Sequence, residues 1–243
     1  MKTEFLYGIH PVREALKAGR RNCLEIFVST DRSSSRHTET RAAADALNIP
    51  IQTITSSQIS ALAGSDAHQG IGAKVSSYPL VDMETLIEPR TSCFLLLLDS
   101  IQDPQNMGAL IRTALCAGVT GILFPRDRSS SPLPSVSKAS AGAMEHVKMA
   151  MITNLSTALQ FLKHSGVWIA GLEKSALQTV YDMEWTGPVG IVIGGEEKGI
   201  RPLVRKQCDF LVSIPQAADF NSLNASAAGA VVMYEVLRQR RNT

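Results

Sequence analysis

The chain has 243 residues, 44% of them hydrophobic, and a formal net charge of +2. This length and apolar content suffice for a sizeable core in one or two domains. No run approaches about 18 consecutive apolar residues, so we expect no membrane-spanning helix, and charged residues near the N-terminus argue against a signal peptide. The small net charge neither demands nor excludes nucleic acid as a partner.

The four cysteines lie far apart in the sequence and form no CxxC pair. This spacing argues against a structural zinc site and against a disulfide framework. We therefore expect no metal, a reducing cytoplasmic environment, and cysteines that serve as small core residues.

The first 78 residues predict a small α/β unit. Short apolar runs bounded by turn residues predict three strands, at 23–29, 50–55 and 70–78. An alanine-rich helix is expected over 38–49, and a second helix over 56–64 begins at serines and ends in a glycine. The following segment, 79–92, has prolines near both ends and weak periodicity, which predicts a linker with room for one short helix.

From residue 93 the pattern changes to longer apolar strands that alternate with helices. The strands are apolar at nearly every position, as in a parallel sheet with both faces covered; they are 93–100, 119–125, 167–173, 189–195 and 210–215. Helices are expected between and after them, over 105–117, 135–144, 153–165, 201–207 and 222–240. This alternation predicts an open parallel α/β sheet over 93–243.

Ligands of open parallel sheets bind beyond the carboxyl ends of the strands, and polar residues follow three of the predicted strands. Asn106 and Arg112 follow the first. Arg112 interrupts an otherwise apolar helix, so it either reaches solvent or points into a polar site. The glycines of "GGEEKG" (194–199) allow close approach of a ligand, whereas Glu196 alone fits equally well as a helix-start charge.

The third polar stretch, "SLNAS" (222–226), leads into an apolar helix that must be buried. One of its side chains is expected to cap that helix. The remaining amides and hydroxyls need other partners, which a neighbouring loop or a polar ligand can supply.

Together these stretches resemble the three signature motifs of the SpoU/TrmH branch of the SPOUT RNA methyltransferases, in the family's order and spacing. They are "LDSIQDPQNMGALIRTALCAGV" (98–119), "IVIGGEEKGI" (191–200) and "VSIPQAADFNSLNASAAGAVVMYE" (212–235). Further stretches, 7–16, 68–75 and 124–131, look like family members that methylate a guanosine ribose in bacterial large-subunit ribosomal RNA. In one departure, Glu197 and Lys198 stand where many relatives have a smaller turn.

The resemblance implies a C-terminal SPOUT domain (93–243) with a trefoil knot, preceded by a ribosomal-protein-like domain (1–78) that binds the RNA substrate. It implies S-adenosylmethionine as methyl donor, no metal, and a homodimer with the first-motif and C-terminal helices at the interface. The donor-binding positions that it implies are Gly194, Gly195, Gly199, Ile214, Pro215 and Leu223. The catalytic candidates are Asn106, Arg112, Glu196, Ser222 and Asn224.

In the implied reaction a ribose 2′-hydroxyl attacks the methyl group of the donor, so the hydroxyl must be oriented and lose its proton. Two roles for Arg112 stay open. It accepts the proton, against the usual resistance of a guanidinium to deprotonation, or it grips a phosphate and stabilises the developing alkoxide.

RNA binding is expected to be mainly electrostatic. The candidate contacts are Arg13, Lys17, Arg20, Arg21, Arg126 and Arg128, for each of which a solvated surface charge is the alternative. Three other functions remain open: ribose methylation of tRNA, a non-catalytic role in ribosome assembly, and an ordinary nucleotide-binding enzyme. The absence of GxGxxG after the first strand of the larger domain disfavours the last.

Overall fold

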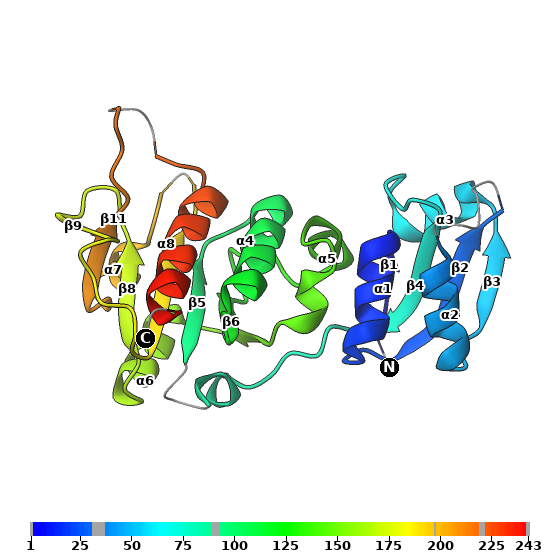
Figure 1. Ribbon diagram of the computed structural model, residues 1–243, viewed down its shortest axis with the longest axis horizontal. Coiled ribbons are helices and arrows are strands. Elements are labelled where there is room, and N and C mark those ends of the chain that lie inside the picture. Colours follow the sequence, from blue (N-terminus) through cyan, green and yellow to red (C-terminus); the bar gives the residue numbers. More distant parts are fainter. Residues whose placement is uncertain (1, 31–36, 89–92, 197, 219–221, 242–243) are drawn as a thin grey trace. The chain divides into compact units, whose positions relative to one another are not determined.

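The computed structural model describes residues 2–30, 37–88, 93–196, 198–218 and 222–241, and its contacts divide into two compact units (Figure 1). The first unit comprises Met1–Pro79 with Pro132–His146, and the second comprises Leu80–Ser131 with Val147–Thr243. The segment 132–146 thus belongs by its contacts to the first unit, although in the sequence it lies within the range 93–243.

The first unit contains a four-stranded mixed sheet in the order β1-β4-β2-β3. Its strands are β1 (Thr3–Tyr7), β2 (Cys23–Ser29), β3 (Ile51–Ile54) and β4 (Ile71–Ser76). Strand β4 pairs antiparallel with β1 and β2, while β2 and β3 are parallel. The helices are α1 (Ile9–Ala18), α2 (Thr38–Ala46), α3 (Ser56–Ala63), α5 (Pro134–Ala139) and the 3-10 helix η4 (Ala143–His146).

The elements β1 and α1 of this unit were not predicted, and the predicted helix 135–144 is divided into α5 and η4. The remaining predicted strands and helices are present, with shorter bounds at several ends. The start of α3 illustrates the local chemistry, since Thr55 and Gln58 form a capping box in which each side chain accepts the other's backbone N–H.

The second unit contains a seven-stranded sheet in the order β7-β6-β5-β10-β8-β11-β9, with every neighbouring pair parallel. Its strands are β5 (Phe94–Asp99), β6 (Gly121–Pro125), β7 (Met149–Ile152), β8 (Trp168–Leu172), β9 (Gln178–Thr179), β10 (Val189–Gly194) and β11 (Phe210–Ser213). The five predicted strands are confirmed, and β7 and β9 add to them at the two edges. This is the mixed α/β architecture with a parallel sheet that the sequence predicted.

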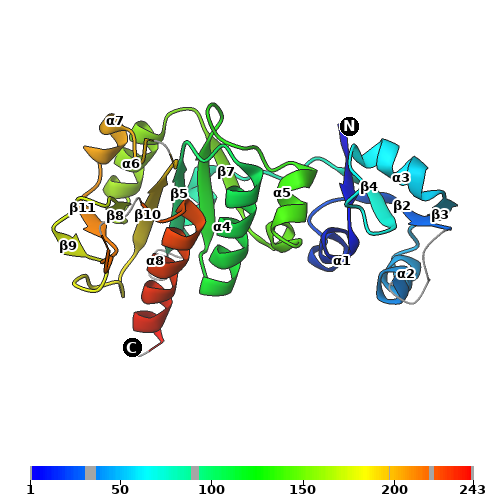
Figure 2. The ribbon, with the colours of Figure 1, turned by 90° about the horizontal axis from the view of Figure 1, so that it is seen from above.

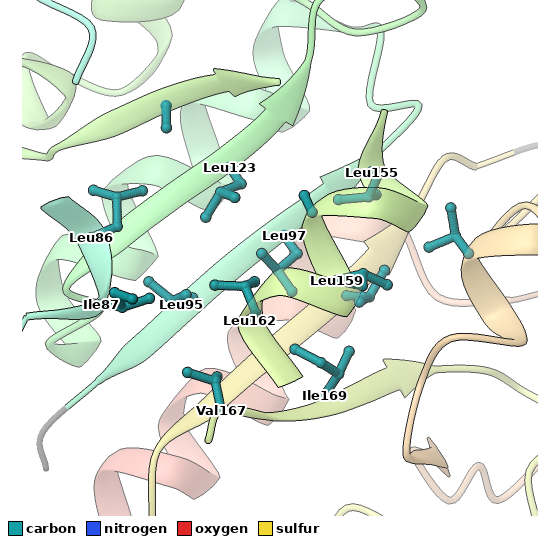
Figure 3. Close-up of a cluster of buried hydrophobic side chains, with 14 of the residues drawn as sticks. Leu86, Ile87, Leu95, Leu97, Leu123, Leu155, Leu159, Leu162, Val167 and Ile169 are labelled. Atoms are coloured by element: carbon teal, nitrogen blue, oxygen red, sulfur yellow. The ribbon is translucent and has the colours of Figure 1, made fainter. Parts of the chain in front are cut away.

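Helices cover both faces of this sheet. On one face α6 (Leu155–His164) packs Leu155, Leu159 and Leu162 against Leu95 and Leu97 of β5 (Figure 3). On the other face α4 (Pro104–Ala117) and α8 (Ala225–Arg240) lie side by side (Figure 2). Because both faces are buried, β5 is buried at every position.

The segment expected to be a linker contributes to the core of the second unit. Its 3-10 helix η2 (Met83–Ile87) buries Leu86 and Ile87 in the same cluster as Leu95 and Leu123. The two elements approach closely at Gly121, where an added Cβ atom would lie 2.7 Å from Leu86 Cδ2 and would force that side chain to shift. Leu86 therefore fixes η2 against β6.

The predicted helix 201–207 is reduced to the single turn of α7 (Pro202–Arg205), and α8 begins three residues later than predicted. The path of the chain between β11 and α8 includes residues outside the described ranges, so the trefoil knot stays a prediction. No helix among the described residues has the length and apolar character needed to cross a membrane.

Candidate active site

The carboxyl ends of the neighbouring strands β5 and β10 are joined by Asp99, the last residue of β5. Its side chain is fully buried. Its carboxylate accepts hydrogen bonds from the backbone N–H of Arg201 (2.8 Å) and from Arg201 Nε (2.6 Å), and its backbone carbonyl accepts the N–H of Gly195 (2.8 Å). Asp99 therefore holds the loop after β10 against the end of β5.

That loop folds back on itself so tightly that glycine is required at Gly194. A Cβ atom there would overlap the backbone of Gly199 and the nitrogen of Ile200. The Gly199 N–H donates to the Gly195 carbonyl (2.8 Å), and Gly199 itself has a φ of 60°, which a glycine adopts without strain. The glycines of the second motif thus shape the loop by close packing.

The first and third motifs each place an asparagine at the start of a helix. Asp103 caps α4 by accepting the N–H groups of Gln105 (3.1 Å) and Asn106 (3.2 Å), with Pro104 in the first turn. Asn224 caps α8, because its Oδ1 accepts the N–H groups of Ser226 (2.9 Å) and Ala227 (3.4 Å). The expected cap of the C-terminal helix is therefore Asn224.

The two asparagines meet Glu196 in an amide–carboxylate cluster built from all three motifs. Asn224 Nδ2 donates to Asn106 Oδ1 (3.0 Å) and to Glu196 Oε1 (3.0 Å). Asn106 Nδ2 also donates to Glu196 Oε1. No described residue donates a hydrogen bond to Glu196 Oε2, so one oxygen of this exposed carboxylate can accept a proton or a hydrogen bond from a ligand.

Two cavities meet at this cluster. The smaller cavity, about 290 Å³, has apolar walls from Leu172, Ile193, Ile214 and Leu223, and it is lined further by Gly194, Gly195, Glu196, Gly199 and Ser222. The larger cavity, about 590 Å³, is lined by Asn106 and by three cationic side chains, Arg128, Lys198 and Arg201. Glu196 lines both cavities, so a group bound in one can reach a group bound in the other.

The structure brings most of the predicted site residues together. Of the donor-binding candidates, all but Pro215 line the smaller cavity. Of the catalytic candidates, Asn106, Glu196 and Asn224 bond to one another, and Ser222 lines the smaller cavity.

Arg112 does not join them within one chain. It is exposed, lines neither cavity, and forms no hydrogen bond or ion pair with a described residue. Arg112 lies six positions after Asn106 on α4, which corresponds to about 9 Å along the helix and to a different face.

The predicted RNA contacts divide into exposed and engaged side chains. Lys17, Arg126 and Arg128 are exposed; of these, Lys17 pairs with Glu14 at 3.6 Å, and Arg128 lines the larger cavity. Arg13 is partly engaged, with ion pairs to Glu14 (3.0 Å) and Glu39 (3.2 Å).

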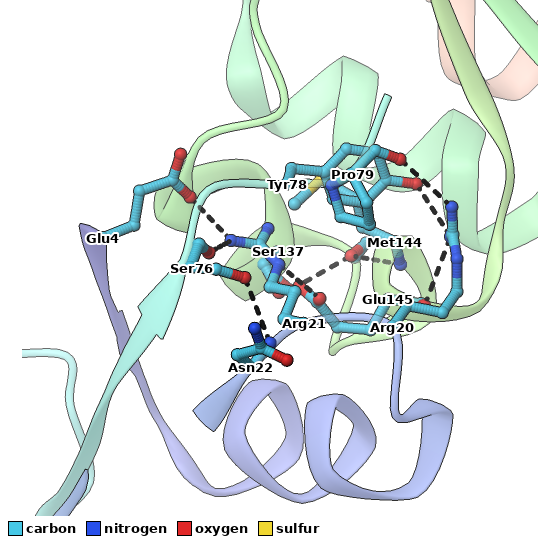
Figure 4. A network of polar contacts seen from close by, with 11 residues as sticks. Glu4, Arg20, Arg21, Asn22, Ser76, Tyr78, Pro79, Ser137, Met144 and Glu145 are labelled. Atoms are coloured by element: carbon cyan, nitrogen blue, oxygen red, sulfur yellow. Dashed lines mark hydrogen bonds and ion pairs between the residues drawn. The ribbon is translucent and has the colours of Figure 1, made fainter. Parts of the chain in front are cut away.

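Arg20 and Arg21 are held inside the first unit (Figure 4). Arg20 donates to the Tyr78 hydroxyl (3.1 Å) and stacks over that ring. The Arg21 side chain is 1% exposed and lies between Glu4 (2.6 Å) and Glu145 (2.7 Å). The prediction that Arg21 contacts RNA is therefore wrong, because its guanidinium is buried and pairs with two carboxylates of its own chain.

Sequence reasoning missed Asp99 and Arg201. The signal was present, since an aspartate that closes an otherwise apolar buried strand needs a partner. Its partner lies 102 residues away, and no local pattern identifies it. Of the two residues that depart from the family's turn, Glu197 lies outside the described residues, whereas Lys198 lines both cavities. Among the described ranges, no three His, Cys, Asp or Glu side chains gather as metal ligands.

The parallel sheet with a glycine loop and an asparagine–glutamate cluster at its carboxyl edge defines an α/β enzyme that binds its ligands at that edge. Residues 93–234 match the model of the SpoU rRNA Methylase family, and residues 5–81 match that of the RNA 2′-O ribose methyltransferase substrate-binding domain. The chain belongs to the SpoU rRNA methylase family and is an RNA 2′-O-methyltransferase by class.

Individual relatives agree with this family. A 23S rRNA (guanosine-2′-O-)-methyltransferase of Yersinia pestis is 38% identical over 241 residues, covering 98% of each chain. The SpoU methyltransferase AviRb of Streptomyces viridochromogenes, solved with AdoMet, superposes with a TM-score of 0.85 at 21% identity and covers 99% of this chain and 92% of its own. The A. aeolicus TrmH/SpoU tRNA modifying enzyme has a TM-score of 0.56 at 22% identity, covering 65% of this chain and 82% of its own.

Proposed function

We propose that this protein transfers a methyl group from S-adenosylmethionine to the ribose 2′-hydroxyl of a guanosine in 23S ribosomal RNA. The observation that carries the proposal is the Asn106–Glu196–Asn224 cluster at the junction of two cavities. The donor occupies the smaller cavity and the target nucleotide the larger one, so that methyl group and hydroxyl meet beside Glu196.

The smaller cavity fits the donor's adenosine. Its apolar walls suit an adenine ring, and the glycine backbone of residues 194–199 allows the close approach that a bulkier loop would block. The donor supplies an electrophilic methyl group when bound. Ile214 and Leu223 hold its adenine, and Gly194, Gly195 and Gly199 pack against it.

Glu196 orients the acceptor. Both amides bind its Oε1, which fixes the carboxylate and leaves Oε2 to accept the hydrogen bond of the ribose hydroxyl. Accepting that proton is general-base catalysis, typically worth about 10²–10⁴-fold. Asn106 and Asn224 position the base, and Ser222 lies at the mouth of the donor cavity.

The role of Arg112 and the formation of a homodimer are proposed together. The exposed Arg112 acts in the active site of a second copy, with α4 and α8 at the interface. Support comes from the exposed apolar side chains of these helices, including Leu115 and Tyr234, and from the distance between Arg112 and its own cluster.

Mixed dimers of Arg112→Ala and Glu196→Gln chains test this arrangement. If Arg112 acts across the interface, half of the randomly mixed dimers regain one intact site, which restores about a quarter of the wild-type activity. If it acts within its own chain, or if the protein is a monomer, mixing restores nothing.

We assign RNA selection to residues 1–78, and we place the protein in the cytoplasm. The four cysteines, all free thiols, support a reducing compartment. The choice of ribosomal RNA rests on the curated relatives and on the substrate-binding domain match. The fold of the tRNA enzyme covers only 65% of this chain.

The test is transfer of labelled methyl groups from S-adenosylmethionine to unmodified 23S rRNA or to bulk tRNA, followed by mapping of the labelled ribose. Label in one rRNA guanosine, lost in Glu196→Gln, supports the proposal. Label confined to tRNA, or an undiminished rate in Glu196→Gln, would overturn the substrate and the mechanism respectively.

A further inference from the structure

The larger cavity contains more positive charge than the chemistry described above uses. Its three cations, Arg128, Lys198 and Arg201, are accompanied by two carboxylates, Asp103 and Glu196. Both carboxylates already accept hydrogen bonds, Asp103 from the first turn of α4 and Glu196 from two amides. Arg128 and Lys198 form no ion pair with a described residue, so they are available to an anion.

Arg201 is the best oriented of the three cations. The buried Asp99 accepts hydrogen bonds from the Arg201 backbone N–H and from Arg201 Nε. These two bonds fix the backbone of Arg201 and the near end of its guanidinium. Its two Nη groups form no hydrogen bond with a described residue, and the side chain is 35% exposed at the cavity wall. A guanidinium held in this way presents a planar pair of donors that match two oxygens of a phosphate.

We propose that Arg201, supported by Lys198 and Arg128, binds the RNA phosphate next to the ribose that is methylated, and that Asp99 is its positioning residue. The inference rests on the proposed function of this site. A phosphodiester is a rigid neighbour of the ribose, so a fixed grip on it sets the position of the 2′-hydroxyl beside Glu196. The other anion of the reaction, the carboxylate of the donor, is the alternative occupant that the experiment must distinguish.

The first measurement compares Arg201→Gln with Lys163→Gln. Lys163 is a matched control because its side chain is 34% exposed and it pairs at 2.7 Å with Asp209, an aspartate that also accepts a backbone N–H, but it lines neither cavity. We expect Arg201→Gln to raise KM for RNA at least tenfold and to lower the salt slope of log(kcat/KM) by about 0.7–1. Lys163→Gln should change neither quantity.

Calorimetry of the donor alone separates the two anions. Unchanged donor affinity in Arg201→Gln is the expected result. A donor affinity that falls as much as RNA affinity assigns Arg201 to the donor's carboxylate and overturns the proposal.

The second measurement requires no substitution in the protein. RNA with a 2′-deoxy target nucleotide binds without reacting, and one flanking phosphate at a time is replaced by an uncharged methylphosphonate. We expect one of the two replacements to weaken wild-type binding at least tenfold and to have no further effect on Arg201→Gln. If the wild type binds both modified RNAs as tightly as the unmodified 2′-deoxy RNA, the inference is refuted. This outcome can be read even if Arg201→Gln fails to fold.

A failure of the proposed function can be distinguished from a failure of this inference. The proposed function fails if wild-type protein transfers no methyl group to rRNA, and the binding of 2′-deoxy RNA still reports whether Arg201 holds a phosphate.

Discussion

Substituting Gly194 by alanine should cost far more activity than its single methyl group suggests. The added Cβ would overlap the backbone of Gly199 and Ile200, and backbone cannot rotate away as a side chain can. Carbon atoms in contact are ordinarily about 3.5–4.0 Å apart, so the returning limb of the loop must retreat by more than about 1 Å.

That retreat displaces the wall of the donor cavity. Ile200, which anchors the loop, is 4% exposed in the core, so the displacement passes to the glycines that face the donor and to Glu196. A misplacement of about 1 Å can cost on the order of 10²-fold in rate, which corresponds to about 2.7 kcal/mol. Strain of about 1–3 kcal/mol in the folded state is expected besides.

Gly187→Ala provides the control, because a Cβ at Gly187 meets no atom within 4 Å and lies just before the same strand. Donor affinity by calorimetry and the initial rate of methyl transfer to rRNA are measured for both variants. Gly194→Ala should lose donor affinity and about two orders of magnitude in kcat/KM, while Gly187→Ala matches the wild type. Equal behaviour of the two variants would refute the claim that close backbone packing sets this site.

Three further predictions concern other parts of the chain. Asn224→Ser should keep the cap of α8, and hence the melting temperature, but lose methyl transfer. Asn224→Ala should lose methyl transfer and also the cap, at a cost of about 1 kcal/mol in stability. Equal melting temperatures of the two variants would contradict the capping role. Arg21→Met leaves the buried Glu145 and the partly buried Glu4 without their cation and should destabilise the protein by about 3–5 kcal/mol, against at most about 1 kcal/mol for Arg13→Met. Urea unfolding measures both values, and similar values would contradict the burial of Arg21. Burial raises the pKa of Cys208 to about 12, so this thiol stays protonated at pH 8. Iodoacetamide should therefore label the exposed Cys116 before Cys208, and peptide mass spectrometry measures the order of labelling.

The sequence predicted the inner strands of the larger sheet because they are apolar at both faces, a local property of strands such as 93–100. Edge strands gave no such signal. Strand β9 has two residues and β7, "MAMI", has four, which are too few to establish a strand pattern. In the first unit the helix α1 was not predicted. It contains Pro11, which lies within the first turn, where proline is tolerated.

The candidate site was predictable to the extent that its residues belong to contiguous motifs. Asn106, Glu196 and Asn224 each stand in a recognisable stretch, and their convergence follows from the rule that parallel strands end at one edge. The burial of Arg21 did not follow, because its partner Glu145 lies 124 residues away and comes from the segment that joins the first unit. Long-range pairs of charges determine which arginines remain available for RNA, and local sequence does not encode them.

The crowding of polar side chains at the start of α8 has a physical explanation in the two uses of Asn224. Its carbonyl oxygen closes the helix, and its amide nitrogen reaches Asn106 and Glu196. An ionised aspartate can perform the first task but has no donor, and a serine or threonine offers a single hydroxyl oxygen for both tasks. The asparagine amide places its acceptor and its donor on two separate atoms, so it performs the two together. The carboxylate at the junction of the cavities is therefore positioned by two side chains that stand at the starts of two helices, and one of them, Asn224, is itself the helix cap.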